Sequence, residues 1–138
     1  MDSAMSIAAS GMQAASVQLA ASASNVANMQ TDGPLPATSP NVPVAQTPGS
    51  VYQPVTVSQT AAPGGGVQAS LSPSLPSYVL AYDPTAPFAN LQGMVAAPNV
   101  DPAAEVVNQI SASIAFKANL AAFKAAQSDY KALFEAMA

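Results

Sequence analysis

Proline is confined to the middle of this chain, and this placement limits where helices can form. Twelve of the thirteen prolines lie between Pro34 and Pro98, whereas residues 1–33 contain none. Proline has no amide hydrogen and clashes with the preceding helical turn, so a segment with a proline in about every five residues cannot form a long helix. The chain therefore divides into three parts: an N-terminal helix within 1–32, an insertion at 33–98 and a C-terminal helix within 99–138.

The N-terminal part predicts one helix from about Ser3 to Asn28. Four large apolar residues recur every seven positions: Met5, Met12, Leu19 and Val26. Three small residues lie between them on the same face: Ala8, Ala15 and Ser22. This narrow stripe favours close packing against another helix. Because no charged residue lies between Asp2 and Asp32, and because the apolar area is small, we expect other helices to surround this one.

The C-terminal part predicts a helix from about Pro102 to Met137. Asp101 is a suitable N-cap, and Glu105 adds a favourable charge in the first turn. A seam of alternating four- and three-residue steps follows: Phe116, Leu120, Phe123, Gln127, Tyr130, Phe134 and Met137. Three earlier apolar residues are one position out of that register: Val107, Ile110 and Ile114. All three lysines of the chain lie beside the seam at a spacing of seven: Lys117, Lys124 and Lys131.

The insertion contains candidate short strands. Val51–Ser58 and Val67–Leu71 flank the turn Pro63–Gly66 and predict a small β-hairpin, in which Pro54 restricts the first strand to an edge. Ser77–Tyr82 is also rich in strand-forming residues. The expected fold class is mainly α, with a proline-rich, irregular insertion and a small β-hairpin between two long helices.

Composition excludes several kinds of function. The chain contains no His, Cys, Trp or Arg, so imidazole bases, thiolate nucleophiles and the usual zinc, haem and iron–sulfur ligands are absent. Asp101 and Glu105 stand four residues apart, but at a helix N-terminus a capping role explains them better than a catalytic one. We therefore expect no catalytic residue, metal, cofactor or small-molecule substrate, and no enzyme activity.

Charge and hydropathy exclude further partners. With a net charge of −4 and three basic residues, the chain cannot neutralise a phosphate backbone, so nucleic acid is not an expected partner. Polar residues interrupt every apolar stretch before it reaches about 18 residues, so direct membrane insertion is not expected. The first lysine is Lys117, so the basic region of a cleaved secretory signal is missing as well.

Ten residues at the end of the N-terminal helix resemble a family signature. Ser24–Gly33 reads SNVANMQTDG, which is similar to the S-N-[VIL]-A-N motif, followed by T and G, of bacterial flagellar axial proteins, the rod and hook subunits. Further matches lie toward the C-terminal end: Tyr82–Pro84, Pro87, Ala89, Gly93–Val95, Pro98–Pro102, Glu105, Val107–Asn108, Ile110–Ser113, Phe116 and Ala118–Asn119. With the chain length, they resemble the proximal-rod members of this family.

The resemblance implies a structural subunit of the proximal rod of the flagellar basal body, which transmits torque and helps to form the export channel for motility. It implies that the N- and C-terminal helices pair in a coiled-coil-like layer. The implied partners are other rod subunits, copies of the same chain and the flagellar export apparatus. The implied location is the periplasmic rod, reached by type III export without a cleaved signal peptide.

The same resemblance points to the residues of helix packing and subunit contacts. They are the two stripes, the seam and the motif asparagines: Met5, Met12, Leu19, Asn25, Val26, Asn28, Val107, Ile110, Ile114, Phe116, Leu120, Phe123, Tyr130, Phe134 and Met137. The residues alone leave two readings open. Asn25 and Asn28 could cap the helix end or contact another chain. The stripes could pack within one chain or against a neighbouring subunit.

The chain departs from the family pattern at Gln18 and Ile114, where arginine is usual, and at Phe116, where tyrosine is usual. These changes affect salt bridges and hydrogen bonds that the family would form between subunits.

Two alternative functions remain. The first is another rod- or hook-like subunit, which Tyr82–Pro98 disfavours. The second is a type III-secreted amphipathic effector, which requires a cationic or strongly amphipathic face that the N-terminal helix lacks.

Overall fold

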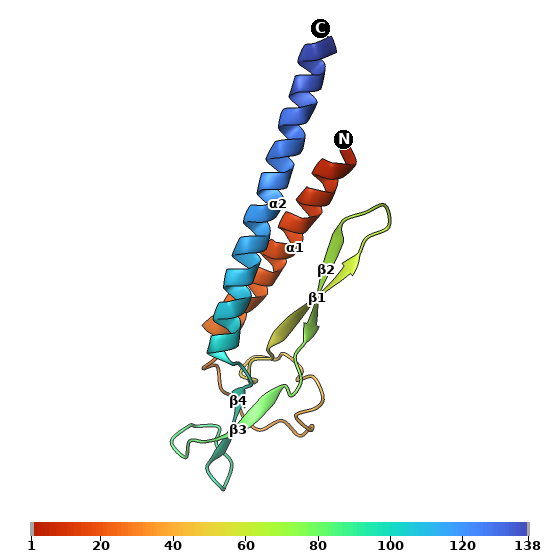
Figure 1. Ribbon diagram of the computed structural model, residues 1–138. Helices are drawn as coiled ribbons and strands as arrows, with labels where there is room; N and C mark the ends of the chain where they lie inside the picture. The colour runs from red at the N-terminus through yellow and green to blue at the C-terminus, as the bar shows by residue number, and fades with distance from the viewer. Residues whose placement is uncertain (1, 138) are drawn as a thin grey trace. The chain divides into compact units, whose positions relative to one another are not determined.

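Two long helices dominate the computed structural model, which describes residues 2–137 (Figure 1). In chain order the elements are α1 (Asp2–Ala27), β1 (Val55–Ala61), β2 (Val67–Pro73), β3 (Tyr78–Tyr82), β4 (Met94–Pro98) and α2 (Pro102–Met137). The expected mainly-α class, with a small hairpin between the helices, is confirmed at this level. The helices begin and end within one residue of the predicted positions, because capping residues and prolines mark their ends in the sequence.

The chain forms two compact units. Among the described residues, the helical unit comprises 2–20, 57–70 and 107–137, and the loop unit comprises 21–56 and 71–106. α1, β1, β2 and α2 contribute residues to both units, whereas β3 and β4 belong to the loop unit. Each unit therefore combines residues that are far apart in the sequence.

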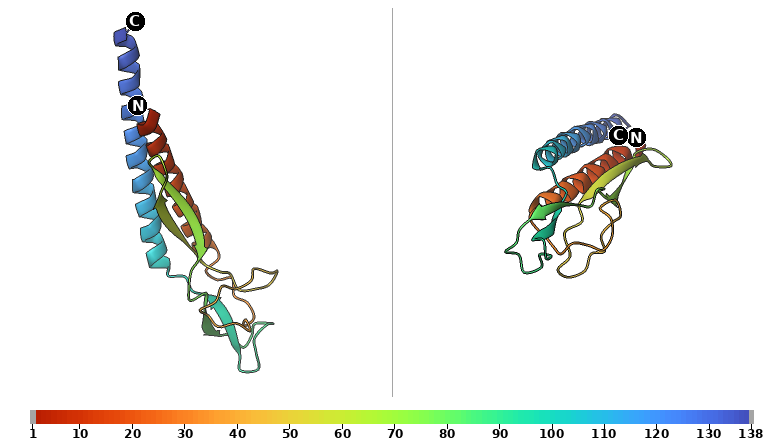
Figure 2. Two further views of the ribbon diagram at one scale, coloured as in Figure 1. Left: turned by 90° about the vertical axis from the view of Figure 1, so that its right-hand side faces the viewer. Right: turned by 90° about the horizontal axis from the view of Figure 1, so that it is seen from below.

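In the helical unit, α1 and α2 lie side by side, and the hairpin lies against α1 (Figures 1 and 2). The buried residues of the two helices are small: Ala8 and Ala15 are 4% and 3% exposed, and Ala112 is 1% exposed. At Gly11 of α1, an added Cβ would collide with the side chain of Asn119 on α2. The positions at which the two helices approach each other are therefore occupied by small residues.

The hairpin of β1 and β2 turns at Gly64–Gly66, as predicted. The three glycines have positive φ angles of 91°, 99° and 90°, which residues with a side chain rarely adopt. The hydroxyl of Ser10 on α1 accepts a hydrogen bond from Val67 N at 3.1 Å. The first strand begins at Val55 rather than at the predicted Val51, because Tyr52 N donates to Thr31 O outside the hairpin and Pro54 has no amide hydrogen.

The loop unit is organised around a second two-stranded sheet. β3 and β4 are antiparallel, with a register that runs from Tyr78↔Pro98 to Tyr82↔Met94. The small core beside them consists of Val51, Tyr78 and Ala96, with Leu35 and Val44 packed against it. β4 was not predicted, because two of its five residues are alanine and one is proline, which are poor strand formers. Its strand conformation comes from pairing with β3 and with Gly33.

Gly33 is the point at which the chain after α1 meets both β4 and the segment before β1. Its amide and carbonyl each form a 3.0 Å hydrogen bond with the backbone of Ala96. A Cβ at Gly33 would overlap Val51 N and would lie only 2.8 Å from the carbonyl carbon of Ser50. The glycine of the motif is therefore required by the close approach of two backbone segments.

We expect Gly33→Ala to destabilise the loop unit by about 2 kcal/mol, because the backbone at Val51 cannot move away without disturbing the core. Urea unfolding of the full chain measures this change. Pro34→Ala is the matched control, since Pro34 is exposed and lies at the next position. An unfolding midpoint that is the same for Gly33→Ala and the unsubstituted chain would contradict the prediction.

Candidate functional site

Asn25, in the last turns of α1, connects three segments of the loop unit. Its side chain is 3% exposed. Oδ1 accepts hydrogen bonds from Val55 N at 3.0 Å and from the Tyr52 hydroxyl at 3.1 Å. Nδ2 donates to Val55 O at 2.8 Å and to Glu105 Oε1 at 2.7 Å. Because a carboxamide has two donor hydrogens and two acceptor sites, these four bonds use its hydrogen-bonding capacity within the chain.

Two serines of the same helix complete this arrangement. Ser22 donates to Glu105 O at 2.9 Å, and the hydroxyls of Ser24 and Tyr52 lie 3.0 Å apart. We name these five residues the Asn25 junction: Ser22, Ser24, Asn25, Tyr52 and Glu105. The junction fastens the end of α1 to the start of β1 and to the first turn of α2.

Sequence reasoning did not identify Tyr52 and gave Glu105 only an electrostatic role at the helix end. Tyr52 and Glu105 are 27 and 80 residues from Asn25 in the sequence. No local pattern marks such distant partners. The one available signal is the family-like motif itself, which singles out Asn25 without naming what it contacts.

Asn28 has a more local role than Asn25. Its Nδ2 donates to Ser24 O at 2.9 Å, in the last turn of α1, and its carbonyl accepts from Thr31 N at 3.0 Å. These contacts close the C-terminal end of α1. Of the two motif asparagines, one therefore joins distant segments and the other terminates the helix.

The predicted α1 stripe divides into a buried and a more exposed part. Its small members are buried, with Ser22 at 2% exposure beside Ala8 and Ala15. Its large members are less buried: Met5, Met12 and Val26 are intermediate, and Leu19 is 43% exposed. The large side chains therefore keep surface that is available to another molecule.

In the first half of α2, the large apolar residues are again more exposed than a small one, and the difference is greater. Val107, Ile110 and Ile114 are 61%, 55% and 62% exposed, whereas Ala112 is 1% exposed. The residue spacing places these three on one side of α2, away from the side on which Ala112 lies. We name Val107, Ile110 and Ile114 the outer stripe. In the single chain, its apolar side chains face solvent.

The predicted seam of α2 becomes more exposed toward its C-terminal end. Leu120 and Phe123 are half-buried, Phe116 and Tyr130 are 38% and 39% exposed, and Met137 is 77% exposed. The rings of Tyr130 and Phe134 pack edge to face with centroids 4.6 Å apart. This part of the seam is thus not a core within the single chain.

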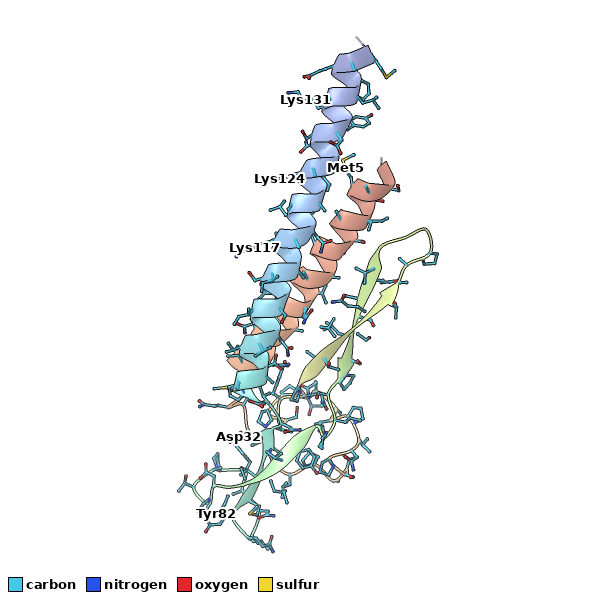
Figure 3. The ribbon with its side chains drawn as sticks, viewed as in Figure 1. Met5, Asp32, Tyr82, Lys117, Lys124 and Lys131 are labelled. Carbon is cyan, nitrogen blue, oxygen red and sulfur yellow. The ribbon has the colours of Figure 1, made fainter. Side chains whose placement is uncertain are left out.

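The three lysines lie in a row along one side of α2 (Figure 3). Among the described side chains, the one ion pair joins Lys131 Nζ to Glu135 Oε1 at 3.7 Å, and both residues are largely exposed. Figure 3 places Lys124 level with Met5, and Lys131 beyond the N-terminal end of α1. All three are exposed.

The acidic residues of the described part of the chain include a helix cap and no metal-binding cluster. Asp101 caps α2 as predicted, since its Oδ1 accepts from Ala103 N at 2.9 Å and from Ala104 N at 3.4 Å. The part of the chain that the structure describes contains no cluster of acidic residues suited to a metal ion. None of its helices is long and apolar enough to cross a membrane. The pKa of Asp83 is lowered, chiefly by the hydrogen bond from the Thr85 hydroxyl and also by that from Thr85 N.

Two family models match the chain. The model described as "Flagella basal body rod protein" matches residues 5–34, which include most of α1 and the family-like motif. The model described as "Flagellar basal body rod FlgEFG protein C-terminal" matches residues 91–135, which include β4 and nearly all of α2. The matched residues thus contain most of both long helices and the junction residues Ser22, Ser24, Asn25 and Glu105.

Curated relatives match over most of their length. The flagellar basal-body rod protein FlgC of Bacillus subtilis (strain 168) is 32% identical over 131 residues, covering 88% of this chain and 87% of the relative. The FlgC protein of Aquifex aeolicus (strain VF5) is 33% identical over 138 residues, covering 96% and 94%. The FlgC protein of Salmonella typhimurium is 36% identical over 114 residues, covering 83% and 81%.

Proposed function

The chain belongs to the FlgC family of flagellar basal-body rod proteins and is a structural subunit of the rod, and from this premise we propose that it forms part of the proximal rod, transmits torque and helps to enclose the export channel. Its relatives are structural rod proteins, and the residues named above supply no catalytic group. The proposed action is therefore mechanical: the subunit holds its neighbours in place.

The exposed apolar surface of the helical unit supports this proposal most directly. The unit buries alanines and leaves the larger side chains of the outer stripe more than half exposed. Soluble monomers rarely expose a continuous apolar face, whereas subunits of permanent assemblies bury such faces against their neighbours. We therefore assign the outer stripe and the exposed end of the seam to contacts between subunits.

The proposed layer consists of paired end helices in a coiled-coil-like arrangement. The alanines of α1, the closeness of Gly11 to Asn119 and the heptad spacing of Met5, Met12 and Leu19 support this arrangement. Leu19 and the seam residues Phe116 and Tyr130 are each about two-fifths exposed, which leaves them able to contact a neighbouring helix.

Torque transmission requires subunits that do not slide past one another. Close-packed apolar side chains resist shear because their displacement opens cavities and forfeits contacts on both surfaces. An assembly that buries the outer stripe and the seam of every subunit acquires this resistance along the whole rod. The hydrogen bonds of the Asn25 junction would hold each subunit's own helix ends together under the same load.

The departures from the family pattern fit a rod that relies on apolar contacts. Gln18, where arginine is usual, accepts a hydrogen bond from Gln59 Nε2 at 3.3 Å within the helical unit. Ile114, at the second such position, is an exposed member of the outer stripe. Neither position offers a salt bridge to a neighbour. We propose that packing of the outer stripe takes the place of that ionic contact.

The proposed partners are other rod subunits, further copies of this chain and the flagellar export apparatus. The basal body is the location that the family indicates. We place the subunit in the periplasmic part of the rod and propose that it is exported without cleavage of a signal peptide. Intact N-terminal sequence in purified basal bodies, measured by mass spectrometry, would test the last point.

The rod assignment predicts that a clean deletion of the gene leaves cells without hooks and filaments. Electron microscopy of the cell surface and swimming assays measure this effect, and a plasmid copy of the unsubstituted gene should restore both. Purified basal bodies should contain the chain. Normal flagella in the deletion strain, together with absence of the chain from purified basal bodies, would contradict the assignment.

A further inference from the structure

The last three heptads of α2 repeat one short pattern. An aromatic residue is followed by lysine and alanine at Phe116–Ala118, Phe123–Ala125 and Tyr130–Ala132. Because seven residues advance a helix by about 10.5 Å and fall about 20° short of two full turns, the three lysines form a nearly straight row about 21 Å long. Figure 3 shows this row along one side of α2. It contains every basic residue of an otherwise acidic chain.

Apolar hollows adjoin the row at both ends. One has a volume of about 200 Å³, lies between α1 and α2, and includes Leu19, Ala112, Phe116 and Lys117 in its lining. The other is an open groove on the surface of α2 alone, with a volume of about 550 Å³, and is lined by Lys124, Gln127, Ser128, Tyr130, Lys131 and Phe134. Each end of the row therefore combines a lysine with an aromatic surface that can contact apolar side chains of a partner.

Apolar hollows with a basic rim suit an amphipathic helix that carries carboxylates. In paired helices, apolar side chains fill the seam while charges on its flanks select the partner and its orientation. A partner helix that pairs with all three lysines needs a carboxylate at every seventh residue. Such a helix would place its apolar seam over the two hollows.

A second copy of this chain does not have that pattern. Its seven acidic residues are Asp2, Asp32, Asp83, Asp101, Glu105, Asp129 and Glu135, and no two of them are seven residues apart. Within α2, Glu135 already pairs with Lys131 of the same chain. Glu105 binds Asn25 in the loop unit. Self-association therefore cannot match the row at more than part of its length.

We propose that the lysine row and its two hollows are the docking surface for a helix of a different rod subunit, one that carries acidic residues at heptad spacing. This assignment rests on the proposed rod function and specifies the chemistry of one neighbour. The outer stripe consists of other residues of α2, but it adjoins the row, because Ile110 lies seven residues before Lys117 and continues its line.

A synthetic helix of three heptads, with leucine in its seam and glutamate at every seventh position, tests the docking surface directly. We expect it to bind the full-length chain about tenfold more tightly than a twin with glutamine in place of glutamate, and to weaken as the NaCl concentration rises. The triple variant Lys117→Glu, Lys124→Glu and Lys131→Glu should lose this preference, and the triple arginine variant should keep it. Equal binding of the two helices would overturn the proposal.

The same variants separate this inference from the rod assignment in cells. We expect the triple glutamate variant to leave cells without filaments and the triple arginine variant to support swimming. Motile revertants of the glutamate variant should carry an acidic-to-basic substitution in the gene of another rod subunit. Normal swimming of the glutamate variant, in a strain whose deletion mutant has no filaments, would overturn the docking proposal and leave the rod function intact.

Discussion

An Asn25→Leu chain is expected to lose the loop unit and to leave cells without flagellar filaments. Leucine has a similar volume but neither donates nor accepts hydrogen bonds, so the substitution removes all four bonds of Asn25. Val55 N and Val55 O then lose their bonds to the Asn25 side chain, and the Glu105 carboxylate loses one of its hydrogen bonds, all at partly buried positions. Each such loss costs about 1–3 kcal/mol, so we expect a destabilisation of about 4 kcal/mol.

That loss is large compared with the roughly 5–15 kcal/mol that stabilises a typical domain. Hydrogen exchange of the full-length chain provides the measurement, with faster exchange expected in β3, β4 and the segment before β1. Asn28→Leu is the matched control, because that side chain bonds only groups within four residues, Ser24 O and the Thr31 hydroxyl. Asn28→Leu should retain swimming. Equal effects of the two substitutions would show that the motif acts without the Asn25 junction.

The double substitution Ile110→Asp, Ile114→Asp is expected to abolish rod assembly without unfolding the single chain. Both side chains are more than half exposed, so the aspartates remain hydrated in the monomer. In an assembled rod the same positions would be buried against a neighbour, where an unpaired carboxylate is very costly. We therefore expect swimming to be lost completely and the chain to be missing from purified basal bodies.

Two further measurements complete this prediction. Circular dichroism of the purified variant should give the helix content of the unsubstituted chain. The apolar pair Ile110→Leu, Ile114→Leu keeps the surface hydrophobic and should support normal swimming. If the aspartate variant assembles and swims, the outer stripe is a solvent-facing surface and the contact between subunits lies elsewhere. If its helix content falls, the two isoleucines stabilise the monomer instead.

The sequence was sufficient for the features that depend on local chemistry. Proline placement separated helical from non-helical parts, because the missing amide hydrogen acts wherever proline occurs. Asp101 and Pro102 marked the start of α2, and Gly64–Gly66 marked the hairpin turn, because caps and positive φ angles are requirements of single positions.

The roles of the interface residues could not be derived in the same way. A heptad pattern shows which residues share a helix face, but it does not show whether that face meets the same chain or another. The outer stripe illustrates this limit, since the structure buries Ala112 and leaves Ile110 and Ile114 exposed. The seam of α2 has the same ambiguity, because Phe123 is half-buried whereas Phe134 is 55% exposed.

What the sequence determined by itself was the position of both helices, the hairpin turn and the absence of the usual catalytic and metal-binding residue types. Only the tertiary structure decided that Asn25 joins Tyr52, Val55 and Glu105, that β4 is a strand, and that Gly33 must lack a side chain. These features depend on groups that are tens of residues apart. Hydrogen bonds and steric exclusion act over a few ångströms in space, so they become visible only when the folded chain brings those groups together.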